Sequence, residues 1–84
     1  MPLEKKIDHA LLKKRSVTIA GHRTSVSIEG AFWDILNRAA SDQNISINQL
    51  ITQIDEVRVQ ENSGASSGNL SSALRLYALD YAMK

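Results

Sequence analysis

Apolar and polar side chains alternate along residues 15–28, RSVTIAGHRTSVSI, which is typical of a half-buried β-strand. Before Gly21 the apolar residues occupy odd positions, and after it they occupy even positions. A period of two changes phase either at a bulge or at a turn. The pairing of residues that a turn would require can be checked against the sequence, and it decides between a turn and a bulge.

A two-residue loop at Gly21-His22 pairs Ala20 with Arg23 and gathers the apolar side chains on one face, namely Val17, Ile19, Val26 and Ile28. The opposite face then carries only polar side chains, namely Ser16, Thr18, Arg23, Ser25 and Ser27. Glycine at the first loop position suits a type II′ hairpin turn. We therefore favour a β-hairpin over a bulge.

Apolar spacings of three and four residues predict helices at 29–42, about 47–58 and about 70–82. Gln43-Asn44-Ile45 connects the first two, and Ser46 is a candidate N-cap for the second. Residues 3–14 carry a shorter stripe, which predicts a short helix that is marginal alone. We expect the third helix, opened by Asn69, to pack through Leu70, Leu74, Tyr77, Ala78 and Tyr81. We expect the core to include Phe32, Leu36, Ile47, Leu50, Ile51 and Ile54, with Trp33 in the core or at a dimer seam.

A chain of 84 residues forms one domain. The pattern divides it into a basic N-terminal arm, a strand-and-helix core, a Gly/Ser-rich linker and an amphipathic C-terminal helix, at 1–14, 15–59, 60–68 and 69–84. The fold class is mainly α with a short β-ribbon. A domain this small often needs a staple or a partner, and the chain has no cysteine for disulfides. Since the apolar stripes exceed what we expect one chain to bury, the sequence predicts an obligate homodimer.

Charge is distributed unevenly along the chain. Residues 1–23 hold six basic and two acidic side chains, a surplus of +4, whereas residues 24–84 hold four basic and seven acidic ones, a surplus of −3. A basic end on a slightly acidic body is typical of an anion-binding arm, and also of an arm that only aids solubility.

Catalytic and metal-binding patterns are missing from the sequence. The absence of cysteine excludes thiol nucleophiles and Cys-ligated metals, and neither His9 nor His22 has a partner at a catalytic spacing. No phosphate-binding or hydrolase motif occurs. We expect no enzyme activity, no cofactor and no metal. No apolar run reaches the roughly 18 residues of a membrane span, so we expect a cytoplasmic protein without membrane association.

The order strand, helix, short turn, helix over residues 24–58 resembles the ribbon-helix-helix (Arc/MetJ-type) superfamily. Two longer strings, Lys14–Ser25 and Asn69–Leu76, resemble a bacterial subgroup with an extra N-terminal strand. The resemblance covers roughly residues 14–80. It implies a homodimer in which strands pair into a ribbon over a shared helical core.

The resemblance also implies a DNA-binding transcriptional regulator or antitoxin-like repressor whose ribbon enters the major groove. Carried over to this sequence, the ribbon positions that face bases are Arg23, Ser25 and Ser27. The phosphate contacts are the main chain of Ser46, Ile47 and Asn48 at a helix N-terminus, with Lys13, Lys14 and Arg15 from the arm.

Two departures keep a second function open. Only Arg23 is a long donor among the ribbon positions, and serine specifies a base weakly. A hairpin in each subunit also makes a dimer sheet of four strands, which spans about 14 Å, against a major groove about 12 Å wide. The alternative is a protein-interaction module that keeps the dimeric fold without binding DNA, with the C-terminal helix as a surface for a protein partner.

Overall fold

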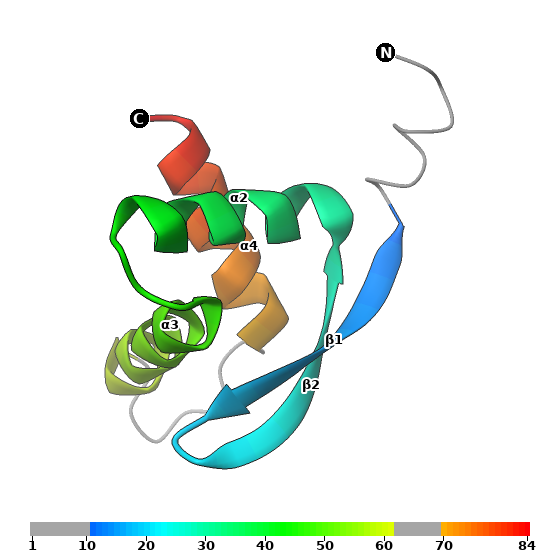
Figure 1. Cartoon of the computed structure of the whole chain (residues 1–84), viewed down its shortest axis with the longest axis vertical. Coiled ribbons are helices and arrows are strands. Elements are labelled where there is room, and N and C mark those ends of the chain that lie inside the picture. The colour runs from blue at the N-terminus through cyan, green and yellow to red at the C-terminus, as the bar shows by residue number, and fades with distance from the viewer. Residues whose placement is uncertain (1–10, 62–69) are drawn as a thin grey trace.

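The computed structural model describes residues 11–61 and 70–84. A two-stranded antiparallel hairpin lies on one side of the molecule, and three helices lie on the other, to its left in Figure 1. In chain order the elements are β1 (Leu12–Ile19), β2 (His22–Glu29), α2 (Gly30–Asp42), α3 (Ile47–Glu61) and α4 (Leu70–Ala82). One face of the hairpin therefore packs on the helices and the other is open.

The hairpin is confirmed, but its loop is Ala20-Gly21 and not Gly21-His22. Ile19 pairs with His22 across the loop. Ala20 has φ of 52° and Gly21 has φ of 83°. Positive φ at both loop positions is the pattern of a type I′ turn, whose twist matches that of the strands, so glycine takes the second position and not the first.

The corrected loop changes the cross-strand partners without changing the faces. Val17 lies opposite Thr24, where the sequence predicted Val26, and Val26 lies opposite Arg15. Moving the loop by one residue shifts each partner by two positions, which leaves every side chain on its own side of the sheet. The apolar face is therefore as predicted: Val17, Val26 and Ile28 are buried and Ile19 packs against the core.

The predicted helix at 3–14 is wrong at its C-terminal end, because β1 begins at Leu12. Lys13 pairs with Ile28 and Lys14 with Ser27, so the end of the arm belongs to the strand ladder. Main-chain pairing with β2 outweighs a short amphipathic stripe that is marginal as a helix. Residues 3–10 of that prediction lie outside the described residues.

The predicted helices at 29–42 and 47–58 are α2, which begins at Gly30, and α3, which continues to Glu61. They meet around buried aliphatic side chains, and the left-handed Asn44, with φ of 61°, reverses the chain between them. Among the predicted core residues, Leu36, Leu50, Ile51 and Ile54 are buried, whereas Phe32, Trp33 and Ile47 pack against the core from partly exposed positions.

The third predicted helix is α4, and it docks on its own chain. Leu74 and Ala78 have no exposed surface, and the other predicted contacts, Leu70, Tyr77 and Tyr81, pack around them. The Gln43 amide donates to the Tyr77 hydroxyl at 2.9 Å, and the Tyr81 hydroxyl donates to Asp42. The Arg75 guanidinium pairs with Glu29 at 2.8 Å.

This docking buries much of the apolar surface of the helices within one chain, but Val57, Val59, Leu76, Leu79 and Met83 stay exposed. The core of described residues closes within one chain, because α4 covers α2 and β2. A groove between α3 and α4 stays open, with Val57 51% and Leu76 68% exposed at its rim. One chain therefore buries the centre of its core and leaves apolar surface exposed on α3 and α4.

Candidate nucleic-acid interface

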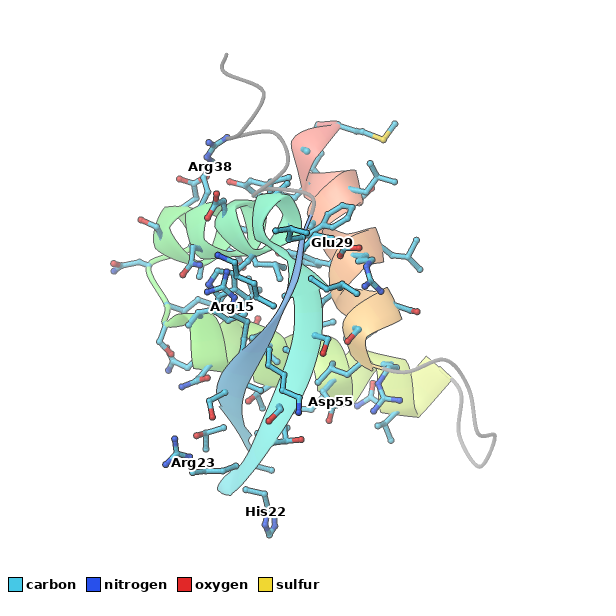
Figure 2. The ribbon with its side chains drawn as sticks, turned by 90° about the vertical axis from the view of Figure 1, so that its right-hand side faces the viewer. Arg15, His22, Arg23, Glu29, Arg38 and Asp55 are labelled. Atoms are coloured by element: carbon cyan, nitrogen blue, oxygen red, sulfur yellow. The ribbon has the colours of Figure 1, made fainter. Side chains whose placement is uncertain are left out.

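The open face of the hairpin carries polar side chains along most of its length. Cross-strand partners share a face, so β1 and β2 jointly present Lys14 opposite Ser27, Ser16 opposite Ser25 and Thr18 opposite Arg23. All of these are exposed except Thr18, which is partly exposed. Figure 2 views this face directly, with Arg23 near the turn. The structure thus brings the three predicted ribbon positions together on one accessible surface.

The hairpin is also the most basic part of the described chain. Between residues 12 and 29 there are four basic side chains and a single acidic one, Glu29. That carboxylate is engaged by Arg75. The hydrogen bond from Arg75 is the main cause that holds the pKa of Glu29 below its ordinary value, so Glu29 stays ionised and paired. The exposed cations of the hairpin therefore face no competing free carboxylate of their own strands.

The three basic residues predicted from the arm separate onto different faces. Lys14 shares the open face with Arg23, but Lys13 and Arg15 alternate with it and belong to the helix side. The Arg15 guanidinium lies over the Trp33 ring, 5.1 Å from its centroid, and the Arg15 Nε is buried without a hydrogen-bond partner. The structure therefore gives Arg15 a packing contact with α2 and does not place it beside Arg23, Ser25 and Ser27.

The N-terminus of α3 is built by a capping box. The Ser46 hydroxyl accepts the Gln49 N–H at 3.0 Å, and the Gln49 side-chain oxygen accepts the Ser46 N–H at 2.8 Å. The Ser46 N–H and hydroxyl oxygen are thus engaged within the cap, and its main-chain oxygen accepts the Leu50 N–H at 3.0 Å. The N–H groups of Ile47 and Asn48 belong to the first turn, where an α-helix supplies no internal acceptor. Of the three predicted phosphate contacts, these two keep donors directed out of the helix.

Asn48 connects this helix end to the hairpin. Its side-chain oxygen accepts the Thr18 N–H at 3.2 Å, and α3 packs along β1. A concavity between them is lined by Thr18, Ala20, Gly21, Asn48, Gln49, Thr52 and Gln53. The two predicted contact regions, the ribbon and the α3 N-terminus, are therefore neighbours in one chain.

Ser16 and Thr18 also belong to the open face, although sequence reasoning assigned them no contact. Pairing places Ser16 beside Ser25 and Thr18 beside Arg23. Their parity within the alternating strand was the available signal, because it put both residues on the polar face. Among the described residues, His, Asp and Glu form no cluster able to hold a metal ion. No described helix has the length and apolar character that crossing a membrane requires.

Comparison with known proteins gives the chain a family. The ribbon-helix-helix domain family matches residues 12–82, a range that includes β1, the linker and α4. A solved structure of an uncharacterized protein from Bordetella pertussis Tohama I superposes with a TM-score of 0.77 at 28% sequence identity. That alignment covers 99% of this chain and 70% of the other. No curated protein matches. Since the family match spans most of the chain, this protein belongs to the ribbon-helix-helix domain family.

Proposed function

We propose that the protein is a homodimeric DNA-binding regulator, a transcriptional or antitoxin-like repressor that contacts duplex DNA with the open face of its hairpin. The observation that carries this proposal is the composition of that face: exposed hydroxyls and two cations, Lys14 and Arg23, with the Glu29 carboxylate of the same hairpin paired to α4. Members of the ribbon-helix-helix family are commonly DNA-binding regulators, which supports the same function.

Arg23 is the side chain best suited to read a base. Its guanidinium has the planar fork that grips guanine or phosphate with two hydrogen bonds. Ser25 and Ser27 follow it on the same face of β2 at about 7 Å intervals, the spacing of alternate strand residues. Short hydroxyls contact base edges with little discrimination. We therefore assign most of the sequence preference to Arg23, and contacts that do not depend on sequence to Ser25 and Ser27.

Lys14 and the α3 N-terminus complete the proposed interface. Lys14 lies about 13 Å along the strands from Arg23, four residues from Thr18, which pairs with Arg23. At that distance Lys14 is too far away to contact the base pair that Arg23 contacts, and we assign it to a phosphate. The first-turn N–H groups of Ile47 and Asn48 suit a second phosphate, since the positive end of the helix dipole favours an anion there.

The width of a paired sheet restricts how the dimer enters DNA. Four strands span about 14 Å and the major groove is about 12 Å wide. All three proposed base-facing residues are in β2. We therefore propose that the two β2 strands form the centre of the dimer sheet and that only they approach the bases, while each β1 stays near a phosphate backbone.

Fluorescence anisotropy with the protein's own promoter DNA and with random duplex tests this function at two salt concentrations. Arg23→Ala should cost about 1–3 kcal/mol of binding free energy on the specific duplex and relax specificity. Lys14→Ala should weaken binding to both duplexes and reduce the slope of log K against log salt by about one.

Arg38→Ala is the matched control. Arg38 is an exposed arginine on α2, far from the turn where Arg23 lies (Figure 2). Its loss changes the net charge by the same amount, so we expect a smaller and sequence-independent effect. Equal losses for Arg23→Ala and Arg38→Ala would contradict a specific role for the open face of the hairpin.

A second candidate function is a protein-interaction module, favoured by the groove between α3 and α4. Its lining is largely apolar, from Leu50, Ile54, Val57, Ala73, Leu76 and Tyr77. Exposed apolar surface of this kind is typical of sites that bind other proteins. Absence of any DNA binding by the parent protein at low salt would decide for this function.

A further inference from the structure

Helix α4 has a second apolar stripe, on the side that faces away from the core. Its core side is marked by Leu74 and Ala78, which have no exposed surface. Side chains three and four residues apart share a helix face, so Leu76, Leu79 and Met83 line the opposite side, at 68%, 50% and 76% exposure. Met83 directly follows α4, and its N–H still donates to the Leu79 carbonyl at 3.1 Å. We call these three residues the outer stripe, an apolar surface that the described fold leaves uncovered.

The spacing of the outer stripe is that of a coiled-coil seam. Leu76, Leu79 and Met83 follow one another at intervals of three and four residues, as positions a, d and a of a heptad repeat. Position g, directly before Leu76, is Arg75, and position e, directly after Leu79, is Asp80. The seam is therefore flanked by a cation on one side and an anion on the other. Charges at these two positions decide which helix pairs with a seam and in which direction.

Both flanking charges are accessible to another helix. The Asp80 side chain is 75% exposed, and its ion pair with Lys84 has a separation of 3.7 Å, so that pair contributes little. Glu29 accepts from the Nε of Arg75 at 2.8 Å, and the guanidinium carries further N–H donors on its terminal nitrogens. A second carboxylate can therefore bind Arg75 while Glu29 stays in place.

The flanking charges match a second copy of α4 in parallel orientation. In a parallel pair, position g of one helix lies beside position e of the other, so Arg75 meets Asp80 of the second copy. Two-fold symmetry repeats this contact and gives two ion pairs. In an antiparallel pair, g lies beside g and e beside e. Arg75 would then meet Ala82, and Asp80 would meet Ala73, without any pairing of opposite charges.

We propose that α4 is a self-association surface, on which the outer stripes of two copies pack side by side and parallel, with Arg75 of each copy paired to Asp80 of the other. Three apolar side chains from each copy make a short seam, so association is reversible and grows with protein concentration. The surface is separate from the hairpin and does not depend on DNA. A dimer joined through its ribbon carries two outer stripes, so this contact links one such dimer to the next.

Cysteine cross-linking tests the parallel seam, because the chain has no cysteine of its own. Met83→Cys should give a disulfide-linked dimer on mild oxidation, since each a position meets itself across a parallel seam. In an antiparallel pair the two cysteines would be about 16 Å apart along the helix axis, and disulfides need Cα atoms within about 7 Å. Ala82→Cys is the matched control and should not cross-link, because Ala82 is equally exposed but lies beside the seam.

Sedimentation velocity over a series of protein concentrations tests the contacts of the seam. Leu79→Lys puts a charge in the seam and should remove one step of association. The product should be a ribbon dimer where the parent exceeds a dimer, and a monomer where the parent is a dimer. Asp80→Arg should weaken association roughly tenfold, because each ion pair becomes a repulsion between like charges. Glu56→Arg makes the same change of charge at an exposed position of α3 and should leave association unchanged.

Circular dichroism should show that these variants stay folded, since the Leu79 and Asp80 side chains are half or more exposed. Three results would each overturn the proposal: equal cross-linking of Met83→Cys and Ala82→Cys, unchanged sedimentation of Leu79→Lys, and equal effects of Asp80→Arg and Glu56→Arg. Because these measurements use no DNA, a protein that associates through α4 and fails to bind DNA would remove the regulator function and leave the α4 contact standing.

Discussion

At the scale of single residues, backbone conformation decides two turns of the chain. Ala20 and Asn44 are the non-glycine residues with positive φ in the described chain, at 52° and 61°. Asparagine tolerates this left-handed region because its side chain hydrogen-bonds locally, whereas alanine loses about 1–2 kcal/mol there. The hairpin turn is therefore built with a residue that does not favour its conformation, followed by Gly21, which does.

Ala20→Asn should stabilise the protein by about 1 kcal/mol, because Asn-Gly is the preferred pair for a type I′ turn. For a domain of this size that corresponds to a rise of roughly 4–8 °C in Tm. Thermal and urea unfolding followed by circular dichroism measure the effect. Asn44→Ala is the mirror experiment and should lower stability by a similar amount. A drop in stability for Ala20→Asn would mean that the turn is not of this type.

Arg15 shows how one residue's role depends on its face. In the sequence it belongs to the basic run Lys13-Lys14-Arg15 and looks like a phosphate contact. In the structure its guanidinium stacks over Trp33, a contact worth about 0.5–1 kcal/mol at a partly exposed site. We infer that Arg15 contributes to the packing of β1 on α2, and that Lys14 is the basic residue of this run that contributes to the open face.

At the scale of elements, an ion pair between Arg75 and Glu29 connects α4 to the end of β2, and its contribution to stability depends on pH. Arg75 holds the Glu29 carboxylate, so the folded pKa of Glu29 lies below its value in the unfolded chain. A carboxylate with a lowered folded pKa contributes stability above its unfolded pKa and loses that contribution as the pH falls through the folded value. The pair therefore helps to fix the end of β2 against α4 at neutral pH and not in strong acid.

Arg75→Gln should lower the free energy of unfolding at pH 7, and the difference from the parent should shrink as the pH falls below the ordinary Glu29 pKa of 4.5. Urea unfolding at pH 7 and pH 3 measures both differences. Lys84→Gln is the control, since Lys84 and Asp80 are 3.7 Å apart and largely exposed, and such pairs contribute little. An equal effect of Arg75→Gln at both pH values would argue against the ion pair.

At the scale of the whole molecule, α4 completes the core. It packs against α2, α3 and β2, and its buried residues Leu74 and Ala78 join the same cluster as Leu36 and Ile28. One chain thus buries the centre of its core, while Val57, Leu76 and Leu79 remain half or more exposed on α3 and α4.

Truncation after Ser63 should lower both stability and solubility, because it uncovers the apolar surface that α4 buries. Leu74→Ala is the graded version and should cost about 2–5 kcal/mol, the range for truncating a buried leucine. Urea unfolding and sedimentation velocity measure the two effects. Leu79→Ala, at a position 50% exposed on the same helix, should cost far less. Unchanged melting and unchanged oligomer size after truncation would contradict the role of α4 in the core.

The sequence alone determined most of the elements and their faces; the exception is the helix predicted at 3–14, since β1 begins at Leu12. Strict periods of two and of three to four residues located two strands and three helices, because side-chain direction repeats with the backbone geometry of each element. The same periods placed Arg23, Ser25 and Ser27 on one polar face, and Ser46 at a helix cap. These features are local, so their causes lie within a few residues of one another.

Only the tertiary structure decided the loop register, the extension of β1 to Leu12, the separation of Arg15 from Lys14 and the docking of α4 on its own chain. The last three depend on groups distant in sequence: the main-chain partners that β2 supplies, the Trp33 ring beneath Arg15, and the surface that α2 and β2 offer to Leu74. The loop register depends instead on the match between strand twist and turn type. The bond from Thr18 to Asn48 joins residues thirty positions apart, which no periodicity encodes. It exists because packing of α3 on β1 brings a side-chain acceptor to an unpaired strand N–H, and burial or exposure of such groups is settled only when the chain is folded.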